Sequence, residues 1–504
     1  MPPSPRRGST AQAPFFNGRG PIHAAQYRQT ARPPRWGRRV PRKWVHRLEP
    51  RISERHSKGA ISHWTRVRRL IFAWWPWSVI CLYSLVTDRW GWAAVTGSVA
   101  LVNYLMTPEE FPPVYGLDHE FEIESDEFLH TVSGATGTVF AGNRIDLLNN
   151  GDQFYPAMLK AIESAEASVT IEAYIYWAGD IGQKFARALA RRAAAGVSVK
   201  ILLDAVGSAS IGSEILETLE SGRCQLAWYN RIKWYSIGRF NHRTHRKSVI
   251  VDGRVGFTGG AGIADVWVGH AQDPQHWRDM QIRVEGPAVV PLQTGFAANW
   301  LQTTGELITG PRYYPPTDGG GSLVALTVMS SPETGASTVR TMYYLSIVCA
   351  RKSIYIASPY FIPDATAVET LIDAKRRGVD VRIMVAGAHN DNWLARRNSV
   401  MLFGKLLEAD VQVLEYNRTL LHHKTMVVDG LWATIGTTNF DNRSFAHNEE
   451  SNVCIYDRTV AGKLQETFLA DMRDCERLSF DEWRKRGIWS RAQEVVASFL
   501  QDQA

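Results

Sequence analysis

The sequence lacks the signatures of a cofactor-dependent or disulfide-bonded protein. Its 504 residues include only five cysteines, widely spaced and without a Cys-x-x-Cys pair, so neither a disulfide framework nor a structural zinc site is indicated. No Walker sequence is present, and no dinucleotide fingerprint follows a strand-like run. We therefore expect no metal and no cofactor, and any chemistry must come from the chain's own side chains.

Acidic residues are scarce at the start of the chain. Residues 1–69 contain seventeen Lys or Arg against only Glu49 and Glu54, a net charge of +15, whereas the whole chain carries +7. The remainder is therefore acidic, at about −8. With many prolines and few aliphatic residues, residues 1–65 are predicted to be a basic, disordered segment. Its expected partner is an anionic membrane surface, because the acidic remainder would repel nucleic acid.

Two uncharged runs follow the basic segment. Leu70 to Thr87 and Trp90 to Thr107 each contain eighteen residues without a charge, and tryptophans cluster near their ends. Runs of this length either cross a bilayer or lie shallowly in it, and tryptophan favours the headgroup boundary. Residues 66–108 are therefore predicted to form a membrane helical hairpin. The alternative is a soluble, Trp-rich helical pair packed on the rest of the protein.

A two-span hairpin would return the chain to the side from which it started. The arginine-rich leader favours the cytoplasmic side of the inner membrane for that end of the chain. The residues after the hairpin are therefore expected to lie in the cytoplasm. A single span would place them on the opposite side.

A short motif, His-x-Lys followed by four residues and an aspartate, occurs twice in the chain. Its copies are His245, Lys247 and Asp252, and His422, Lys424 and Asp429. Each copy runs through a β-branched, apolar stretch into a turn, Gly259-Gly260 or Gly436-Thr437. On a strand, residues i and i+2 point to the same face, so each motif presents an imidazole beside an ammonium group. One copy alone would be compatible with a chance solvated pair, but two copies with the same spacing argue against chance.

Two such motifs are what displacement at a phosphodiester requires. The reaction needs a nucleophile on one side of phosphorus and a proton donor for the leaving oxygen on the other. Imidazole suits both roles because both of its protonation states are accessible near neutral pH. Two lysines can neutralise the charge on the phosphate oxygens. The sequence therefore predicts one phosphoryl-transfer site built from both motifs.

The repetition extends beyond the motifs. Ser168 to Ile171 resembles Ser353 to Ile356 at an offset of 185, Gly196 to Ile201 resembles Gly378 to Ile383 at 182, and the histidines differ by 177. Helical patterns, Ile181 to Ala195 and Thr366 to Arg377, lie between these strands, so each repeat contains a βαβ unit.

This repeat divides the rest of the chain. We predict an α/β fold of two tandem lobes with mixed sheets flanked by helices, at residues 109–314 and 322–504. Pro315 to Gly321 would form the linker. Asp481 to Gln501 is expected to be a packing helix.

With its doubled motif the chain resembles the phospholipase D superfamily, and within it the bacterial cardiolipin synthase branch. The resemblance covers about residues 140 to 480 and includes the phrases Trp277 to Asp279, Ser358 to Asp364 and Gly436 to Ser444. It implies two lobes related by a pseudo-twofold axis and a phosphohistidine intermediate. By family analogy, His245 is the nucleophile and His422 the general acid, although the near-symmetric sequence leaves the two roles open.

The other candidate site residues follow from the motifs and their alignment. Lys247 and Lys424 are expected to hold phosphate oxygens, with Asn439 as a further donor. Asp252 and Asp429 either brace their motifs or simply form the turns before Gly253 and Gly430. Asp279 aligns with Glu450, and each is expected to accept a ring N–H from a histidine, of its own or of the opposite lobe.

The first motif departs from the family pattern after Gly259 and Gly260. Gly262 stands where the second copy has Asn439, so one side-chain donor is missing. Backbone N–H groups of this turn are the expected substitute, because glycine permits close approach of the backbone.

The predicted activity is a phosphatidyltransferase that passes phosphatidyl from one phosphatidylglycerol to another and releases glycerol. The alternatives are a phospholipase D hydrolase that yields phosphatidic acid, a nuclease of the superfamily, and a non-catalytic lipid-binding scaffold. Aromatic residues near the motifs either exclude water from the site or belong to the core; they are Trp228, Trp234, Tyr235 and Tyr360. The oligomeric state is not predicted.

Overall fold

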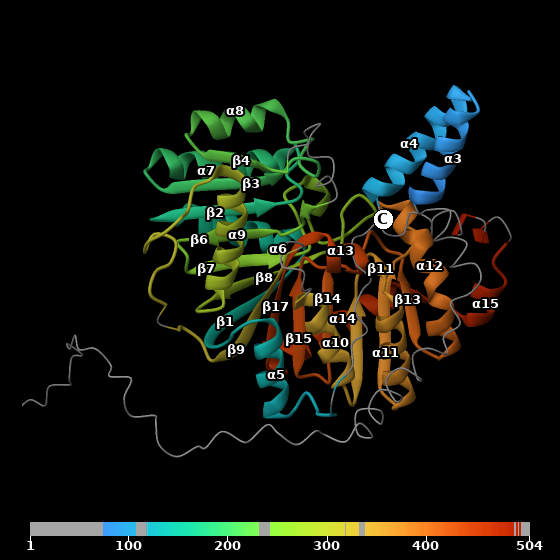
Figure 1. Ribbon diagram of the computed structural model, residues 1–504. Coiled ribbons are helices and arrows are strands. Elements are labelled where there is room, and N and C mark those ends of the chain that lie inside the picture. Colours follow the sequence, from blue (N-terminus) through green and yellow to red (C-terminus); the bar gives the residue numbers. More distant parts are fainter. Residues whose placement is uncertain are drawn as a thin grey trace, which may run out of the picture. The chain divides into compact units, whose positions relative to one another are not determined.

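The computed structural model describes residues 74–106, 117, 119–230, 242–317, 319–331, 338–487, 490–491 and 493–494 (Figure 1). The predicted disordered segment, Trp234, Tyr235 and the end of the predicted C-terminal helix lie outside these residues. Within the described part, the chain after Arg69 belongs to one compact unit that contains both lobes.

Two helices lie within the range predicted for the hairpin. Helix α3 (Trp74–Val86) and helix α4 (Trp90–Met106) pack against each other, and Cys81 of α3 donates a hydrogen bond to the Ala93 carbonyl at 3.2 Å. A Cβ at Gly97 would lie 3.1 Å from the Cys81 sulfur, so a small residue permits this approach. Among the described residues, however, no helix combines the length and the apolar character that crossing a bilayer requires. The two-span prediction is therefore not supported.

The repeat appears in the sheet as two runs of strands in the same order. From the centre outward, the first half contributes β1 (Val139–Asn149), β8 (Met280–Glu285), β7 (Val255–Gly259), β6 (Ser248–Val251), β2 (Ser168–Ala173), β3 (Ser198–Asp204) and β4 (Gln225–Tyr229). The second half contributes β9 (Leu323–Ser330), β17 (Asn448–Tyr456), β15 (Trp432–Gly436), β14 (Lys424–Val428), β10 (Ser353–Ala357), β12 (Asp380–Ala386) and β13 (Gln412–Tyr416), to which β18 (Cys475–Arg477) is added. The runs join through the antiparallel pair β1 and β9 (Figure 1). The predicted fold class is confirmed.

Helices cover the sheets in both halves. They are α5 (Asp126–Thr136), α6 (Asn150–Glu163), α7 (Asp180–Ala194), α8 (Ser213–Ser221), α9 (Val289–Thr304), α10 (Thr338–Val348), α11 (Ala365–Arg376), α12 (Trp393–Glu408), α13 (Asn442–Ala446), α14 (Arg458–Asp471) and α15 (Phe480–Arg484). The apolar residues that recur along α7 and α11 are buried, as the sequence pattern indicates. Each of these helices connects two parallel neighbouring strands, β2 to β3 and β10 to β12.

One apolar core is shared by the two halves. Ile250, Met280 and Ile282 of the first half belong to the same buried cluster as Val427 and Ile435 of the second. Strands β6 and β14, each of which follows a motif histidine, therefore contribute to one core. This shared packing fixes their relative position, as a site built from both motifs requires.

The residues before β1 differ from the predicted lobe bounds. Phe128 of α5 and the preceding Ile123 are fully buried in the core of the second half, and the Phe128 ring meets Trp432 edge-on at 5.0 Å. The Tyr456 hydroxyl donates to the Ile123 carbonyl at 3.1 Å. This segment, assigned from its sequence position to the first lobe, thus packs with the second.

Candidate active site

Both motifs are held by backbone segments of the opposite half. The His245 N–H donates to the Glu449 carbonyl at 2.9 Å, next to the parallel pairing of β5 (Arg243–Thr244) with β17. In the other half, the His422 N–H donates to the Arg278 carbonyl at 2.8 Å, and a parallel bridge joins Arg278 to Leu421. The two motifs therefore meet at the boundary between the halves.

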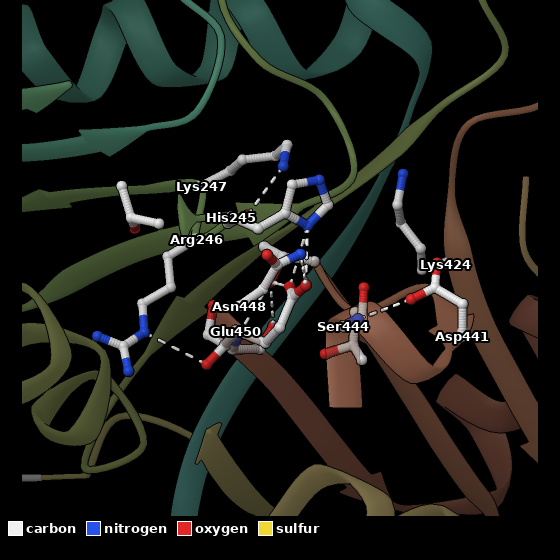
Figure 2. A network of polar contacts seen from close by, with 12 residues as sticks. His245, Arg246, Lys247, Lys424, Asp441, Ser444, Asn448 and Glu450 are labelled. Carbon is white, nitrogen blue, oxygen red and sulfur yellow. Dashed lines mark hydrogen bonds and ion pairs between the residues drawn. The ribbon is translucent and has the colours of Figure 1, made fainter. Parts of the chain in front are cut away.

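The carboxylates are crossed between the halves in the same way. The Nδ1 of His245 lies 3.0 and 3.1 Å from the two carboxylate oxygens of Glu450 (Figure 2), and the Nδ1 of His422 lies 2.8 Å from Asp279. Asp279 and Glu450 are both fully buried. The sequence alignment left open which histidine each acid meets, and the structure pairs each acid with the histidine of the opposite half. With Nδ1–H donated to a carboxylate, Nε2 of each neutral ring carries the lone pair.

Each carboxylate is held by further donors. Glu450 accepts from the Thr437 hydroxyl at 2.5 Å and from Asn448 at 3.4 Å. Asp279 accepts from the Trp267 indole at 2.9 Å and from the Met280 N–H at 2.7 Å. Burial raises the pKa of both carboxyls, but their histidine partners, the motif lysines and the hydrogen bonds from Met280 and Thr437 outweigh burial and hold each pKa below its usual value. Both acids are therefore ionised and can orient their histidines.

Burial also lowers the pKa of both histidines. For His245, burial is opposed by Glu450 and assisted by the two motif lysines, and its pKa falls to about 4. For His422, burial and Lys424 lower the pKa, while Asp279 and Asp391 raise it. Burial thus disfavours the protonated form of both rings, and the buried carboxylate paired with each ring opposes burial.

The two lysines place two positive charges in a buried space. Lys247 and Lys424 are 4% and 1% exposed, and each Nζ donates to the carbonyl of its own motif histidine. Burial and the charge of Lys424 together lower the pKa of Lys247 to about 7, and burial lowers that of Lys424 to about 8. In Figure 2 the two side chains lie on either side of the His245 ring. An anion between them would relieve the repulsion, so the pair forms a candidate phosphate site.

The motif aspartates lie at the far ends of the motif strands. Asp252 accepts three backbone N–H groups at 2.7 to 2.9 Å, and Asp429 accepts three at 2.7 to 2.8 Å. The donors are Glu166, Ala167 and Ser168, and Arg351, Lys352 and Ser353. Both aspartates also occupy left-handed turns, each with φ of 53°. They tie the end of the motif strand to the start of its neighbour, which is the position of a brace and not of a reacting group.

The glycine-rich turn at Gly259 and Gly260 makes room for the carboxylate of Asp279. A Cβ at Gly260 would lie 2.3 Å from an Asp279 carboxylate oxygen and 2.8 Å from the His422 carbonyl. The Gly260 N–H already donates to the Met280 carbonyl at 3.1 Å, so it is not the free phosphate donor that the sequence predicts. A Cβ at Gly262 would lie 2.7 Å from the Ile175 carbonyl and 3.2 Å from the Trp267 ring, which leaves no space for an asparagine.

Several site residues were missed by the sequence analysis. Tyr174 contacts the His245 ring edge-on at 5.3 Å, and the Trp267 ring meets His422 at 5.4 Å. Arg246, the middle residue of the first motif, is buried and forms an ion pair with Glu449 at 2.5 Å. Arg246 also donates to the Glu450 carbonyl (Figure 2), which ties the first motif to the strand that carries its carboxylate. Trp228 packs against the core of the first half.

Comparison with known proteins agrees with this architecture. A family model described as "Cardiolipin synthase, PLD-like domain" matches residues 158–268 and 346–472, and each matched range contains one motif. A crystal structure of phosphatidylserine synthase from Haemophilus influenzae aligns with a TM-score of 0.55 at 13% identity, covering 71% of this chain and 95% of that one. The fold and the doubled motif thus define a two-lobed phospholipase D-like protein.

Relatives identify the branch of the superfamily. The chain is 34% identical over 361 residues to a cardiolipin synthase from Listeria welshimeri, covering 71% of this chain and 75% of the relative. It is 33% identical over 365 residues to cardiolipin synthase 2 from Staphylococcus epidermidis, covering 71% and 74%. The chain belongs to the cardiolipin synthase family of phospholipase D-like proteins. The family resemblance inferred from the motifs is confirmed, and the predicted enzyme class, a phosphatidyltransferase, is the class of this family.

Proposed function

We propose that the protein is a membrane-associated phosphatidyltransferase that passes a phosphatidyl group from phosphatidylglycerol to a hydroxyl of a second phosphatidylglycerol, giving cardiolipin and glycerol. The observation that carries the proposal is the crossed arrangement of His245 with Glu450 and His422 with Asp279 around two buried lysines. Such an arrangement supplies a nucleophile, a proton donor and charge neutralisation for a single phosphodiester.

In the first step, Nε2 of His245 attacks phosphorus, and the bond from phosphorus to the glycerol oxygen breaks. His422, protonated on both ring nitrogens and held by Asp279, gives its Nε2 proton to the departing oxygen. We assign the nucleophile to His245 by analogy with the family, and its pKa of about 4, lowered mainly by burial, leaves Nε2 unprotonated at neutral pH. Lys247 and Lys424 neutralise the oxygens of the phosphoryl group, with Asn439 as a further donor.

In the second step, the acceptor hydroxyl enters where glycerol left. His422, now neutral, takes the hydroxyl proton, and the oxygen attacks the phosphohistidine and releases His245. Glu450 stabilises the positive charge that His245 acquires as it bonds to phosphorus, and Asp279 does the same for protonated His422. Each carboxylate thus acts on a step through the histidine of the opposite half.

Membrane association is proposed from the surface of the α3–α4 hairpin. Apolar side chains there are largely exposed, with Val86 at 77%, Trp90 at 66% and Leu82 at 63%. Exposed apolar patches with tryptophan are typical of sites that bind a lipid surface. The basic residues before the hairpin would add attraction to anionic lipid. The cytoplasmic orientation of the active site stays a prediction.

The test is to give the purified full chain radiolabelled phosphatidylglycerol in vesicles and to resolve the products. Cardiolipin and glycerol in equal amounts are expected. Phosphatidic acid as the sole lipid product would instead assign a hydrolase, because water would then be the acceptor. If no product forms while lipid still binds, the protein is a lipid-binding scaffold and the proposal fails.

A further inference from the structure

A tyrosine and a carboxylate form a pair on one side of the candidate active site. The hydroxyl of Tyr360, just before β11 (Phe361–Ile362), donates to Asp391 at 2.5 Å. Asp391 is exposed and stands two residues before α12, whereas Tyr360 is partly buried. No step proposed above assigns a role to Tyr360 or a ligand to this pair.

Strand pairing places Tyr360 beside Asn439. Strands β11 and β16 (Phe440–Asp441) are parallel, and Phe361 is the register partner of Phe440. The rings of these two phenylalanines stack at 5.0 Å on one face, so the residues before them, Tyr360 and Asn439, point to the other face. Ser358 secures this arrangement, because its hydroxyl accepts the Phe440 N–H at 3.0 Å and donates to the Tyr360 carbonyl at 2.6 Å.

The pair lies close to the groups that would act on phosphate. Burial lowers the pKa of both His422 and Lys424, and the charge of Asp391 opposes that shift. The side-chain oxygen of Asn439, a residue only 5% exposed, has no hydrogen-bond partner among the described residues. A buried polar atom without a partner is uncommon, and it indicates a missing ligand beside Tyr360.

The first half has no counterpart to this group. An isolated bridge from Tyr176 to Ile263 takes the place of the Phe361–Phe440 pairing, so Ile175 and Gly262 stand where the second half has Tyr360 and Asn439. The Ile175 carbonyl and the Trp267 ring close the space beside Gly262. The second half therefore places polar groups at the edge of the site, beside His422 and Lys424. In the first half, the same positions are filled by apolar packing.

The three groups are hydrogen-bond acceptors. The carboxylate of Asp391 can only accept while it is ionised, the Tyr360 hydroxyl has its proton committed to Asp391, and the free atom of Asn439 is an amide oxygen. A carboxylate would repel a second phosphate group, whereas a neutral ligand with several hydroxyl groups would satisfy all three acceptors. The group thus matches a polyol.

We propose that Tyr360, Asp391 and Asn439 bind the glycerol moiety of the alcohol, holding one hydroxyl while the neighbouring hydroxyl reacts at phosphorus. The inference rests on the proposed function, since it names what recognises the alcohol in that reaction. In-line displacement by His245 puts the leaving oxygen opposite the nucleophile, and the acceptor oxygen must return by the same route. Departing and incoming glycerol therefore occupy the same subsite, which selects for glycerol over alcohols with a single hydroxyl.

The experiment is a competition between two acceptors. The full chain is given phosphatidylglycerol in vesicles with equal concentrations of radiolabelled glycerol and 1-propanol, and labelled phosphatidylglycerol is compared with phosphatidylpropanol. Asp391→Asn and Tyr360→Phe should each lower the ratio of glycerol to propanol transfer by about tenfold, as expected for a weakened hydrogen bond to a charged group. The ratio is internal to each sample, so a lower yield of folded protein does not affect it.

A second tyrosine and aspartate in the same half provide the control. The Tyr355 hydroxyl donates to Asp380 at 3.0 Å, and this pair joins β10 to β12 outside the site. Tyr355→Phe and Asp380→Asn should leave the acceptor ratio unchanged. An unchanged ratio in active Asp391→Asn and Tyr360→Phe would overturn the glycerol subsite alone. Failure of the wild-type chain to transfer to either alcohol would overturn the proposed function, and the subsite with it.

Discussion

Replacing Glu450 by glutamine tests the crossed carboxylates. Glu450 is fully buried and makes two contacts with the His245 ring, at 3.0 and 3.1 Å, so Glu450→Gln keeps its shape while removing its charge. The amide can also donate to Nδ1, which would move the ring proton to Nε2 and remove the nucleophilic lone pair. Loss of the carboxylate that orients a catalytic histidine costs about 10⁴-fold in a serine protease, or about 5.5 kcal/mol in the activation barrier. We expect a fall of about 10³- to 10⁴-fold in kcat.

The assay is the initial rate of cardiolipin formation from phosphatidylglycerol. Thr437→Val serves as the control, because it removes the hydroxyl that donates to Glu450 at 2.5 Å and accepts the Ser451 N–H at 2.9 Å, and it leaves the charge of Glu450 in place. A loss of about tenfold is expected for that variant, corresponding to one hydrogen bond to a charged group. If Glu450→Gln stays within tenfold of the wild-type rate, the orienting role of Glu450 is refuted.

Three further predictions concern the turn, the brace and the lysines. Gly260→Ala should lower the rate by at least about 10²-fold by displacing Asp279 from His422, while Gly462→Ala, with nothing within 4 Å of the added Cβ, should not. Asp429→Ala leaves three backbone N–H groups without their acceptor and should lower the free energy of unfolding by about 3 kcal/mol, measured by chemical denaturation. Because burial lowers the pKa of Lys247 to about 7, its charge is present below that pH and is lost above it, so KM for phosphatidylglycerol should rise between pH 6 and 9.

Each of these predictions has a result that contradicts it. Equal rates for Gly260→Ala and Gly462→Ala would mean that the close approach of Asp279 is not needed. An unfolding free energy for Asp429→Ala within 1 kcal/mol of wild type would remove the brace. A KM that is flat across the pH range would show that Lys247 stays charged, or that it does not bind the phosphate.

Much of the fold was readable from the sequence because a duplicated unit shows its own repeat. The drifting offsets between the βαβ units predicted two runs of strands, and β2, β3, β10 and β12 lie where the repeats indicate. The repeated strands are local features, and strand periodicity determines them. The motifs differ from the prediction, because His245 and Lys247 lie between β5 and β6, and of the second pair only Lys424 lies on a strand, β14.

Features that depend on packing between distant segments were not readable. The alignment of Asp279 with Glu450 identified the acids, but only tertiary pairing of β5 with β17 decides which histidine each acid meets. The indole of Trp267 as the donor to Asp279 has no signal in spacing or composition. Similarly, tertiary contacts decide that α5 packs in the core of the second half, although α5 precedes the first repeat in the sequence.

Trapping the covalent intermediate tests the central claim, that two histidines from different halves act on one phosphorus. A phosphatidyl ester with a good leaving group, such as p-nitrophenol, needs no proton donor to depart. His422→Ala should therefore accumulate a phosphatidyl group on His245, located by mass spectrometry of peptides, because no base remains to activate the acceptor. Absence of label on His245, or equal label in the variant that lacks both histidines, would contradict the account.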